Sequence, residues 1–204
     1  MTHIGHSGKV LFMRLFIAVL VLIFSLQSLT KADDIRDFQI EGMGIGDSAL
    51  DFFTEEKIKI NIRPNVFERF SDKKFVLSEI QYDSMFQTYD TVQIIFKRND
   101  KKYQIYGMTG AFFYKKNIDE CYDKMKGISS DILKSIDYEK KNEFNNLKMS
   151  NNVGVYSGIT FYLKKGIISV HCYDWSEKTE KEKNWLDNLR VNIKTDELED
   201  FLNQ

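Results

Sequence analysis

The sequence predicts an α+β fold, a twisted antiparallel sheet covered on one face by helices in the order ααβββ-αβββα. Two hairpin patterns predict antiparallel pairing, because apolar residues alternate with a period of two on either side of turn residues at 91–114 and 153–174. The helical patterns come in blocks and do not alternate strictly with strands. Such an arrangement is typical of α+β domains, not of parallel α/β domains.

The chain begins with the features of a secretory signal peptide. Arg14 supplies a positive charge, residues 15–24 are all apolar, and Ala32 ends a small-x-small cleavage pattern. Met13 is an alternative start. The sequence predicts a signal peptide at 1–32 and a single globular domain at 33–204, in the periplasm or secreted. The alternative is an uncleaved inner-membrane anchor, for which the apolar run is shorter than the about 20 residues of a spanning helix.

The charge balance limits the classes of partner. The chain has 29 basic and 30 acidic residues. Cleavage of the leader would remove Lys9, Arg14 and Lys31 but no acidic residue, so the remaining domain would be mildly acidic. A mildly acidic domain has no electrostatic attraction for nucleic acid or anionic lipid. We therefore expect a protein or envelope component as partner, no nucleic acid, and membrane contact only if the leader stays uncleaved.

The first half of the domain contains two helix starts and three strands. Asp47 or Ser48 begins a first helix, and Thr54 caps a second that ends before Pro64. A strand is predicted at 74–81. The hairpin at 91–114 follows, with a turn at Asn99 and a bend at its glycines.

The second half contains the strongest helix, at 118–136, where apolar residues recur at three- and four-residue spacing. Residues 137–152 are polar and are predicted to form a loop. The hairpin at 153–174 comes next, then a short helix with a Thr179-x-x-Glu182 capping box. A strand through Leu189 and a final helix capped by Thr195 complete the domain.

Ser48 lies in a Gly-Asp-Ser sequence, which is the nucleophile signature of GDS(L) esterases. A serine nucleophile needs a base such as His. The only His after the leader is His171, and the residue three before it is Ile168 where the family has Asp. The family's Gly-x-Asn-Asp segment is also missing. The simpler interpretation is a helix cap, with Ser48-x-x-Asp51 as a capping box.

His171 and Cys172 adjoin in a predicted strand, so their side chains point to opposite faces and cannot act as nucleophile and base. His171 is therefore a weak catalytic candidate, favoured only because imidazole titrates near neutral pH.

The two cysteines are expected to pair. Cys121 lies on the apolar stripe of the long helix, and Cys172 lies on the apolar side of its strand. An oxidising compartment favours a Cys121–Cys172 disulfide over two buried thiols. Two Cys and one His fall short of a closed zinc site, so no metal is expected, and no cofactor motif occurs.

Tyr173, Trp175 and Trp185 form a candidate aromatic binding patch. The alternative is that they belong to the core, as aromatic residues in strands usually do.

Three segments, "IEGMGIGDSALDFF", "NDKKYQIYG" and "CYDWS", together resemble small exported proteins of marine alphaproteobacteria. That resemblance implies export and lends no activity. The stretch "GMGIGDSALDFFTEEKIK" is also similar to the start of β-lactamase-inhibitor-like envelope modules, which implies protein binding without catalysis. We therefore expect a non-enzymatic binding module, and a small envelope hydrolase using Ser48 or His171 is the alternative.

Overall fold

The computed structural model describes residues 34–115 and 117–204. The predicted signal peptide at 1–32 lies outside these residues. Among the residues described, no helix is both long enough and apolar enough to cross a membrane.

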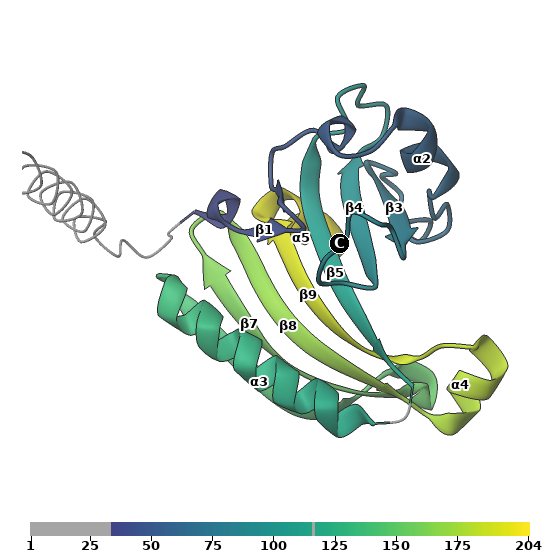
Figure 1. Ribbon diagram of the computed structural model, residues 1–204, viewed down its shortest axis with the longest axis vertical. Helices are drawn as coiled ribbons and strands as arrows, with labels where there is room; N and C mark the ends of the chain where they lie inside the picture. The colour runs from purple at the N-terminus through teal and green to yellow at the C-terminus, as the bar shows by residue number, and fades with distance from the viewer. Residues whose placement is uncertain (1–33, 116) are drawn as a thin grey trace, which may run out of the picture. The chain divides into compact units, whose positions relative to one another are not determined.

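The described chain is α+β, as predicted, and is built on one seven-stranded antiparallel sheet (Figure 1). The strand order is β3-β4-β5-β9-β8-β7-β6, and β1 and β2 form a separate hairpin. The elements in chain order are η1 (Ile35–Asp37), β1 (Gln39–Ile40), β2 (Met43–Gly44), η2 (Ala49–Asp51), α2 (Glu55–Ile60), β3 (Phe75–Gln81), β4 (Thr91–Lys97), β5 (Ile105–Tyr114), α3 (Ile118–Ser135), β6 (Lys140–Lys148), η3 (Ser150–Asn152), β7 (Gly154–Leu163), β8 (Gly166–Trp175), α4 (Glu177–Lys183), β9 (Asp187–Thr195) and α5 (Asp196–Leu202).

Side chains of the large sheet alternate between two faces of different composition. We call them the packed face and the open face. On the packed face, β8 and β9 bring together the aliphatic and sulfur-containing side chains of Ile168, Val170, Cys172, Leu189, Val191 and Ile193. On the open face, the same strands place the polar and aromatic side chains of Ser169, His171, Tyr173, Asn188, Arg190 and Asn192.

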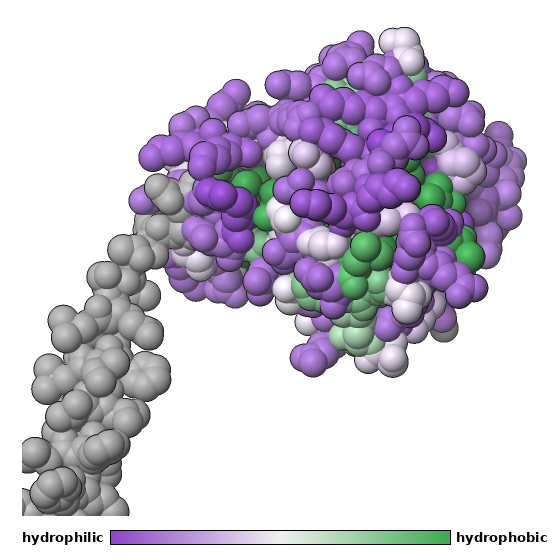
Figure 2. All heavy atoms as spheres, turned by 90° about the horizontal axis from the view of Figure 1, so that it is seen from above, coloured by the Kyte–Doolittle hydropathy of each residue, from purple (hydrophilic) through white to green (hydrophobic). Residues whose placement is uncertain are grey.

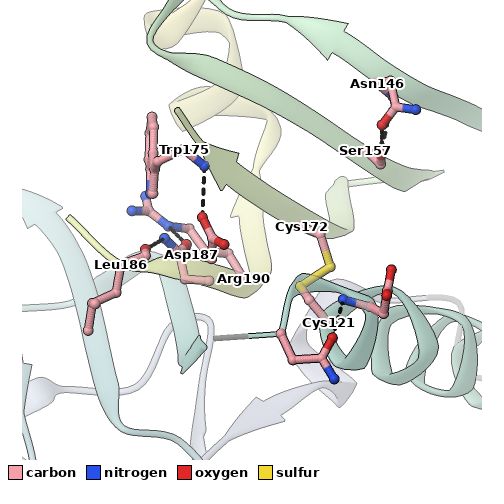
Figure 3. The surroundings of a disulfide bond; sticks show 11 residues. Cys121, Asn146, Ser157, Cys172, Trp175, Leu186, Asp187 and Arg190 are labelled. Atoms are coloured by element: carbon pink, nitrogen blue, oxygen red, sulfur yellow. Dashed lines mark hydrogen bonds between the residues drawn. A yellow bond between two sulfur atoms is a disulfide. The ribbon is translucent and has the colours of Figure 1, made fainter. Parts of the chain in front are cut away.

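Helix α3 covers part of the packed face and runs along the long curved strands β7, β8 and β9 (Figure 1). Cys121 and Met125 of this helix are buried against Val170 and Leu189. The predicted disulfide between Cys121 and Cys172 is confirmed, with 6.0 Å between the two Cα atoms. It fastens the middle of the sheet to its covering helix (Figure 3).

The segment from η1 to α2 covers the other end of the packed face. Thr54 caps α2, as predicted, by accepting a hydrogen bond from the backbone N–H of Lys57. Ile58 of α2 is fully buried, and its carbonyl accepts a 2.9 Å hydrogen bond from the hydroxyl of Ser78 on β3. This end of the packed face therefore joins the main core.

Helix α5 lies on the opposite face, so the prediction that helices cover only one face is wrong. Leu198 of α5 packs with Leu77 and Ile95, which point to the open face. Gly107 of β5 permits this approach, because a Cβ at that position would overlap the side chain of Leu198. Helix α5 therefore covers this end of the open face. Toward α4, no described helix covers the open face.

Three local predictions also need correction. Residues 140–148 form strand β6 where a loop was predicted, and its polar side chains are mostly exposed because β6 is an edge strand. Ser176, not Thr179, caps α4, and its hydroxyl accepts from the N–H of Thr179. The first predicted helix is only the single 3₁₀ turn η2.

The disulfide should contribute measurably to stability. Its cysteines are 51 residues apart, and closing a loop of that size stabilises by about 4 kcal/mol in the chain-entropy model. We expect Cys121→Ala/Cys172→Ala to lower the free energy of unfolding in urea by about 2–4 kcal/mol. Intact mass after alkylation, with and without reductant, checks that the bond is formed. Equal stability of the oxidised and reduced protein would contradict the prediction.

Candidate functional site

An aromatic row crosses the open face. The rings of Tyr156 and Tyr173, a directly opposed pair on β7 and β8, stack at 5.8 Å. Tyr173 stacks on Trp175, two residues further along β8, also at 5.8 Å, and Trp175 packs on Trp185 at 4.6 Å. These four residues, the aromatic row, include all three aromatic candidates of the sequence, which the structure brings into contact.

The end of the row is fixed by hydrogen bonds at the start of β9 (Figure 3). The backbone N–H of Trp175 donates to Asp187 at 2.8 Å, and burial raises the pKa of this carboxyl group. The side-chain amide of Asn188 donates to the carbonyl of Leu186, also at 2.8 Å. These bonds hold the segment that carries Trp185 against the sheet.

A hollow of about 570 Å³, the aromatic hollow, lies beside this end of the row. Its rings come from Tyr82, Phe113, Trp175 and Trp185. Its polar lining comes mainly from side chains of β3, β4 and β9 that point to the open face. The hollow thus combines apolar walls with hydrogen-bonding groups, as ligand sites usually do.

Exposed large apolar side chains occur at several places on the described surface, and those outside the aromatic hollow are Leu50, Ile60, Val66, Tyr138 and Leu147. Figure 2 shows a mostly hydrophilic surface in which apolar residues form separate patches. Trp185 is 45% exposed and Tyr82 is 67% exposed, and both belong to the aromatic hollow. Exposed aromatic rings next to a hollow indicate a binding surface more strongly than scattered ones do.

Arg190 contacts the row at Tyr173, and the sequence patterns did not single it out. Its guanidinium lies over the ring of Tyr173, 4.9 Å from the centroid, and its Nε donates to Asn188 Oδ1 at 2.8 Å. The alternation of β9 could have revealed it. One side of this strand is apolar, and the other side carries Asn188, Arg190 and Asn192.

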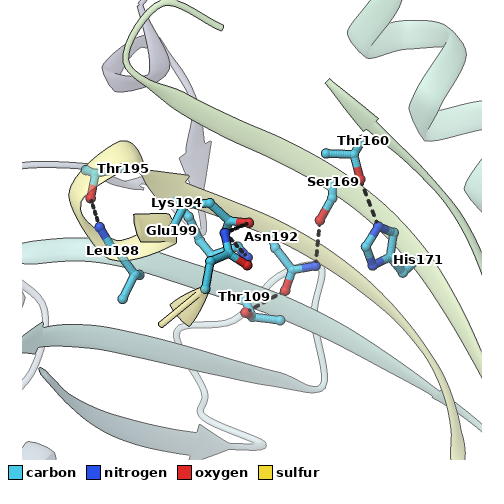
Figure 4. A network of polar contacts seen from close by, with 10 residues as sticks. Thr109, Thr160, Ser169, His171, Asn192, Lys194, Thr195, Leu198 and Glu199 are labelled. Atoms are coloured by element: carbon cyan, nitrogen blue, oxygen red, sulfur yellow. Dashed lines mark hydrogen bonds and ion pairs between the residues drawn. The ribbon is translucent and has the colours of Figure 1, made fainter. Parts of the chain in front are cut away.

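The centre of the open face is occupied by its own polar network (Figure 4). Thr109 donates to Asn192 at 2.8 Å, and Asn192 donates to Ser169 at 3.1 Å. Because these buried polar groups bond to each other across three adjacent strands, this part of the face is already satisfied. The room for a ligand lies in the aromatic hollow.

His171 faces this network but is poorly suited to acid–base chemistry near neutral pH. Burial, together with the positive charges of Lys194 and Arg190, lowers its pKa to about 4. Its Nε2 lies 3.2 Å from the hydroxyl of Thr160. The ring packs over Gly158, where a Cβ would overlap it.

Ser48 is held in a different place and forms no dyad with His171. Its hydroxyl donates to the carbonyl of Lys102 at 2.6 Å and accepts from the N–H of Leu50 at 3.2 Å. Asp47 accepts from the N–H of Gly44 at 2.8 Å. Both polar residues of the Gly-Asp-Ser sequence therefore satisfy backbone groups. Within the described ranges, no cluster of metal-ligating side chains occurs either.

A second hollow, of about 500 Å³, lies near α2 and is lined by charged residues of both signs. Glu55 in this hollow accepts from the hydroxyl of Tyr103 at 2.9 Å and pairs with Lys59 at 2.8 Å. The aromatic rings that line this second hollow are buried, whereas the aromatic hollow has exposed rings.

The neutral state of His171 predicts a specific loss of stability in acid. The folded pKa is about 4 and the unfolded pKa is about 6.5, so the unfolded chain binds the proton more tightly. The stabilisation is complete above about pH 6.5 and is lost as the pH falls toward 4, by up to about 3 kcal/mol. We expect His171→Gln to show a smaller decrease in the free energy of unfolding over this range.

Urea unfolding of the two proteins at matched pH values provides the measurement. Carboxyl groups contribute equally in both proteins, so the difference isolates His171. Parallel stability–pH curves would contradict the assigned pKa.

Known proteins give no guide to the function of this chain. No family model matches the sequence, and neither a curated protein nor a solved structure matches it. The function is therefore inferred from the aromatic row and the hollow beside it.

Proposed function

We propose that this protein is an exported, non-enzymatic binding module that recognises a protein or envelope component through the aromatic hollow. The observation that carries the proposal is the aromatic row, which ends in the exposed ring of Trp185 at a hollow on an uncovered part of the sheet. Trp, Tyr and Arg are the residue types most enriched at energetically dominant interface positions.

The rigidity of the row supports binding. Three of its rings belong to paired strands, and Trp185 is held by its contact with Trp175. Aromatic side chains that are already ordered lose little conformational entropy when a partner covers them. The surface is therefore preorganised in its free state.

Two further features support an exported protein as the setting. The disulfide is of the kind that persists in oxidising compartments, and residues 1–32 have a signal-peptide pattern. The nearly balanced charge favours a protein or envelope partner over nucleic acid. Membrane contact would require the leader to stay uncleaved.

The alternative, a small envelope hydrolase, gains no support from the site geometry. The hydroxyl of Ser48 is engaged with the carbonyl of Lys102, and the half-buried His171 contacts the hydroxyl of Thr160. Catalysis would need a base within about 3 Å of the nucleophile or one bridging water.

A matched pair of exposed aromatic residues tests the binding proposal. Trp185 lines the hollow and is 45% exposed, whereas Tyr138 lies outside it and is 41% exposed. We expect Trp185→Ala to weaken capture of the partner at least about tenfold, as loss of a central interface aromatic does. Tyr138→Ala should leave capture unchanged.

The measurement is crosslinking capture from the native envelope by the wild type and both variants, quantified by mass spectrometry. The supporting result is a protein captured by the wild type and Tyr138→Ala but lost with Trp185→Ala. If the two variants capture the same proteins equally, the hollow is not the binding surface. Turnover that depends on Ser48 would favour the hydrolase.

A further inference from the structure

We propose that the aromatic hollow recognises an acidic side chain that neighbours an aromatic residue in the partner protein, with Arg190 binding the carboxylate. This inference rests on the proposed function and names the chemistry of that same site. It follows from the geometry of Arg190, from the state of the other charged group in the hollow, and from the arrangement of the rings.

Arg190 is held in one orientation before any ligand arrives. Its Nε donates to Asn188 at 2.8 Å, and Asn188 is in turn fixed by the carbonyl of Leu186. The guanidinium plane lies over Tyr173 at 4.9 Å. A guanidinium fixed through Nε and a ring keeps its two terminal nitrogens for a ligand, in the geometry that matches a carboxylate.

No acid of the described chain neutralises Arg190. It takes part in none of the ion pairs between described residues, and its only side-chain hydrogen bond there is the one to Asn188. Its side chain is half-buried, between Tyr173 and the hollow. A partly desolvated cation without a counter-charge gains most from an anionic partner.

Glu79 is the other charged residue that lines the hollow, and it is already engaged. One carboxylate oxygen accepts from Arg63 at 3.3 Å and from Gln81 at 2.5 Å, and the other accepts from Gln93 at 2.9 Å. Arg63 thus balances the charge of Glu79. The uncompensated charge of the hollow is the positive charge of Arg190.

The rings of the hollow indicate which type of side chain should neighbour the carboxylate in the partner. Tyr82 and Phe113 lie 6.4 Å apart on one part of the lining, and Trp175 and Trp185 lie 4.6 Å apart on another. A flat aromatic side chain can pack against such walls, which favours an acidic residue with an aromatic neighbour. A strongly basic segment is disfavoured because it would meet the free charge of Arg190.

The protein carries its own reporter for this site. The chain has two tryptophans, and both line the aromatic hollow. The full-length protein can therefore be titrated with a small probe while tryptophan fluorescence is followed. The probe is N-acetyl-glutamyl-phenylalanine amide, and its matched control is the glutaminyl analogue, which differs only in lacking the carboxylate.

We expect a saturable fluorescence change with the glutamyl probe and binding at least about tenfold weaker with the glutaminyl control, because a charge-assisted hydrogen bond is lost. Higher salt should reduce this preference. Arg190→Gln should abolish it, and Arg190→Lys should keep part of it. Arg98→Gln, a change at an exposed arginine outside the hollow, should leave it intact.

Equal binding of the two probes, no saturable change with either, or a preference that survives Arg190→Gln would overturn the inference. If Arg190→Gln does not fold, as judged by circular dichroism, the probe pair on the wild type and on Arg190→Lys still decides. A failure here with capture still lost in Trp185→Ala would leave the proposed function standing without carboxylate recognition.

Discussion

The register between β8 and β9 is the constraint on which the rest of the structure depends. It places Val170 opposite Val191 and Cys172 opposite Leu189 on the packed face. The same pairing places His171 opposite Arg190 on the open face. A slip of one residue would exchange the two sets of side chains, and would bury a cation while exposing the aliphatic pairs. The disulfide from Cys172 to α3 holds this register, because Cys172 must stay on the packed face.

The aromatic hollow exists because the helices that pack on the sheet leave part of the open face uncovered. Helix α3 is committed to the packed face by its buried residues and the disulfide, so it cannot cover the open face. Helix α5 covers one end of the open face, where Gly107 admits Leu198 and where Phe201 packs on Phe75. The remaining open face would need another element to cover it, and it carries an aromatic row and a charged residue in place of an aliphatic layer. This composition matches the enrichment of Trp, Tyr and Arg at protein interfaces, which supports the proposed binding role.

The sequence was sufficient at most places where a strong periodicity or a cap signal occurs, and the predicted Thr179 cap is an exception. The two hairpins, α3, the caps at Thr54 and Thr195, and the disulfide are of this kind. It failed for β6, because an edge strand needs few apolar residues and "KKNEFNNLK" has a loop-like composition. The sequence did identify three rings of the site, Tyr173, Trp175 and Trp185, as a candidate patch. It missed Arg190, whose importance comes from contacts with Tyr173 and Asn188 on the folded sheet.

The open face carries a cost in stability, and the proposed carboxylate would offset the part that is due to Arg190. A half-buried guanidinium without a counter-charge weakens a fold at neutral and at acid pH alike. A histidine kept neutral by burial weakens the fold only as the pH falls. Strained or poorly compensated groups tend to persist where function needs them. The disulfide stabilises the fold from the packed face of the same strand, because Cys172 lies between His171 and Tyr173 in the sequence. This stabilisation offsets the costs on the open face. One strand therefore carries the group that secures the fold on its packed face and the groups available to a partner on its open face.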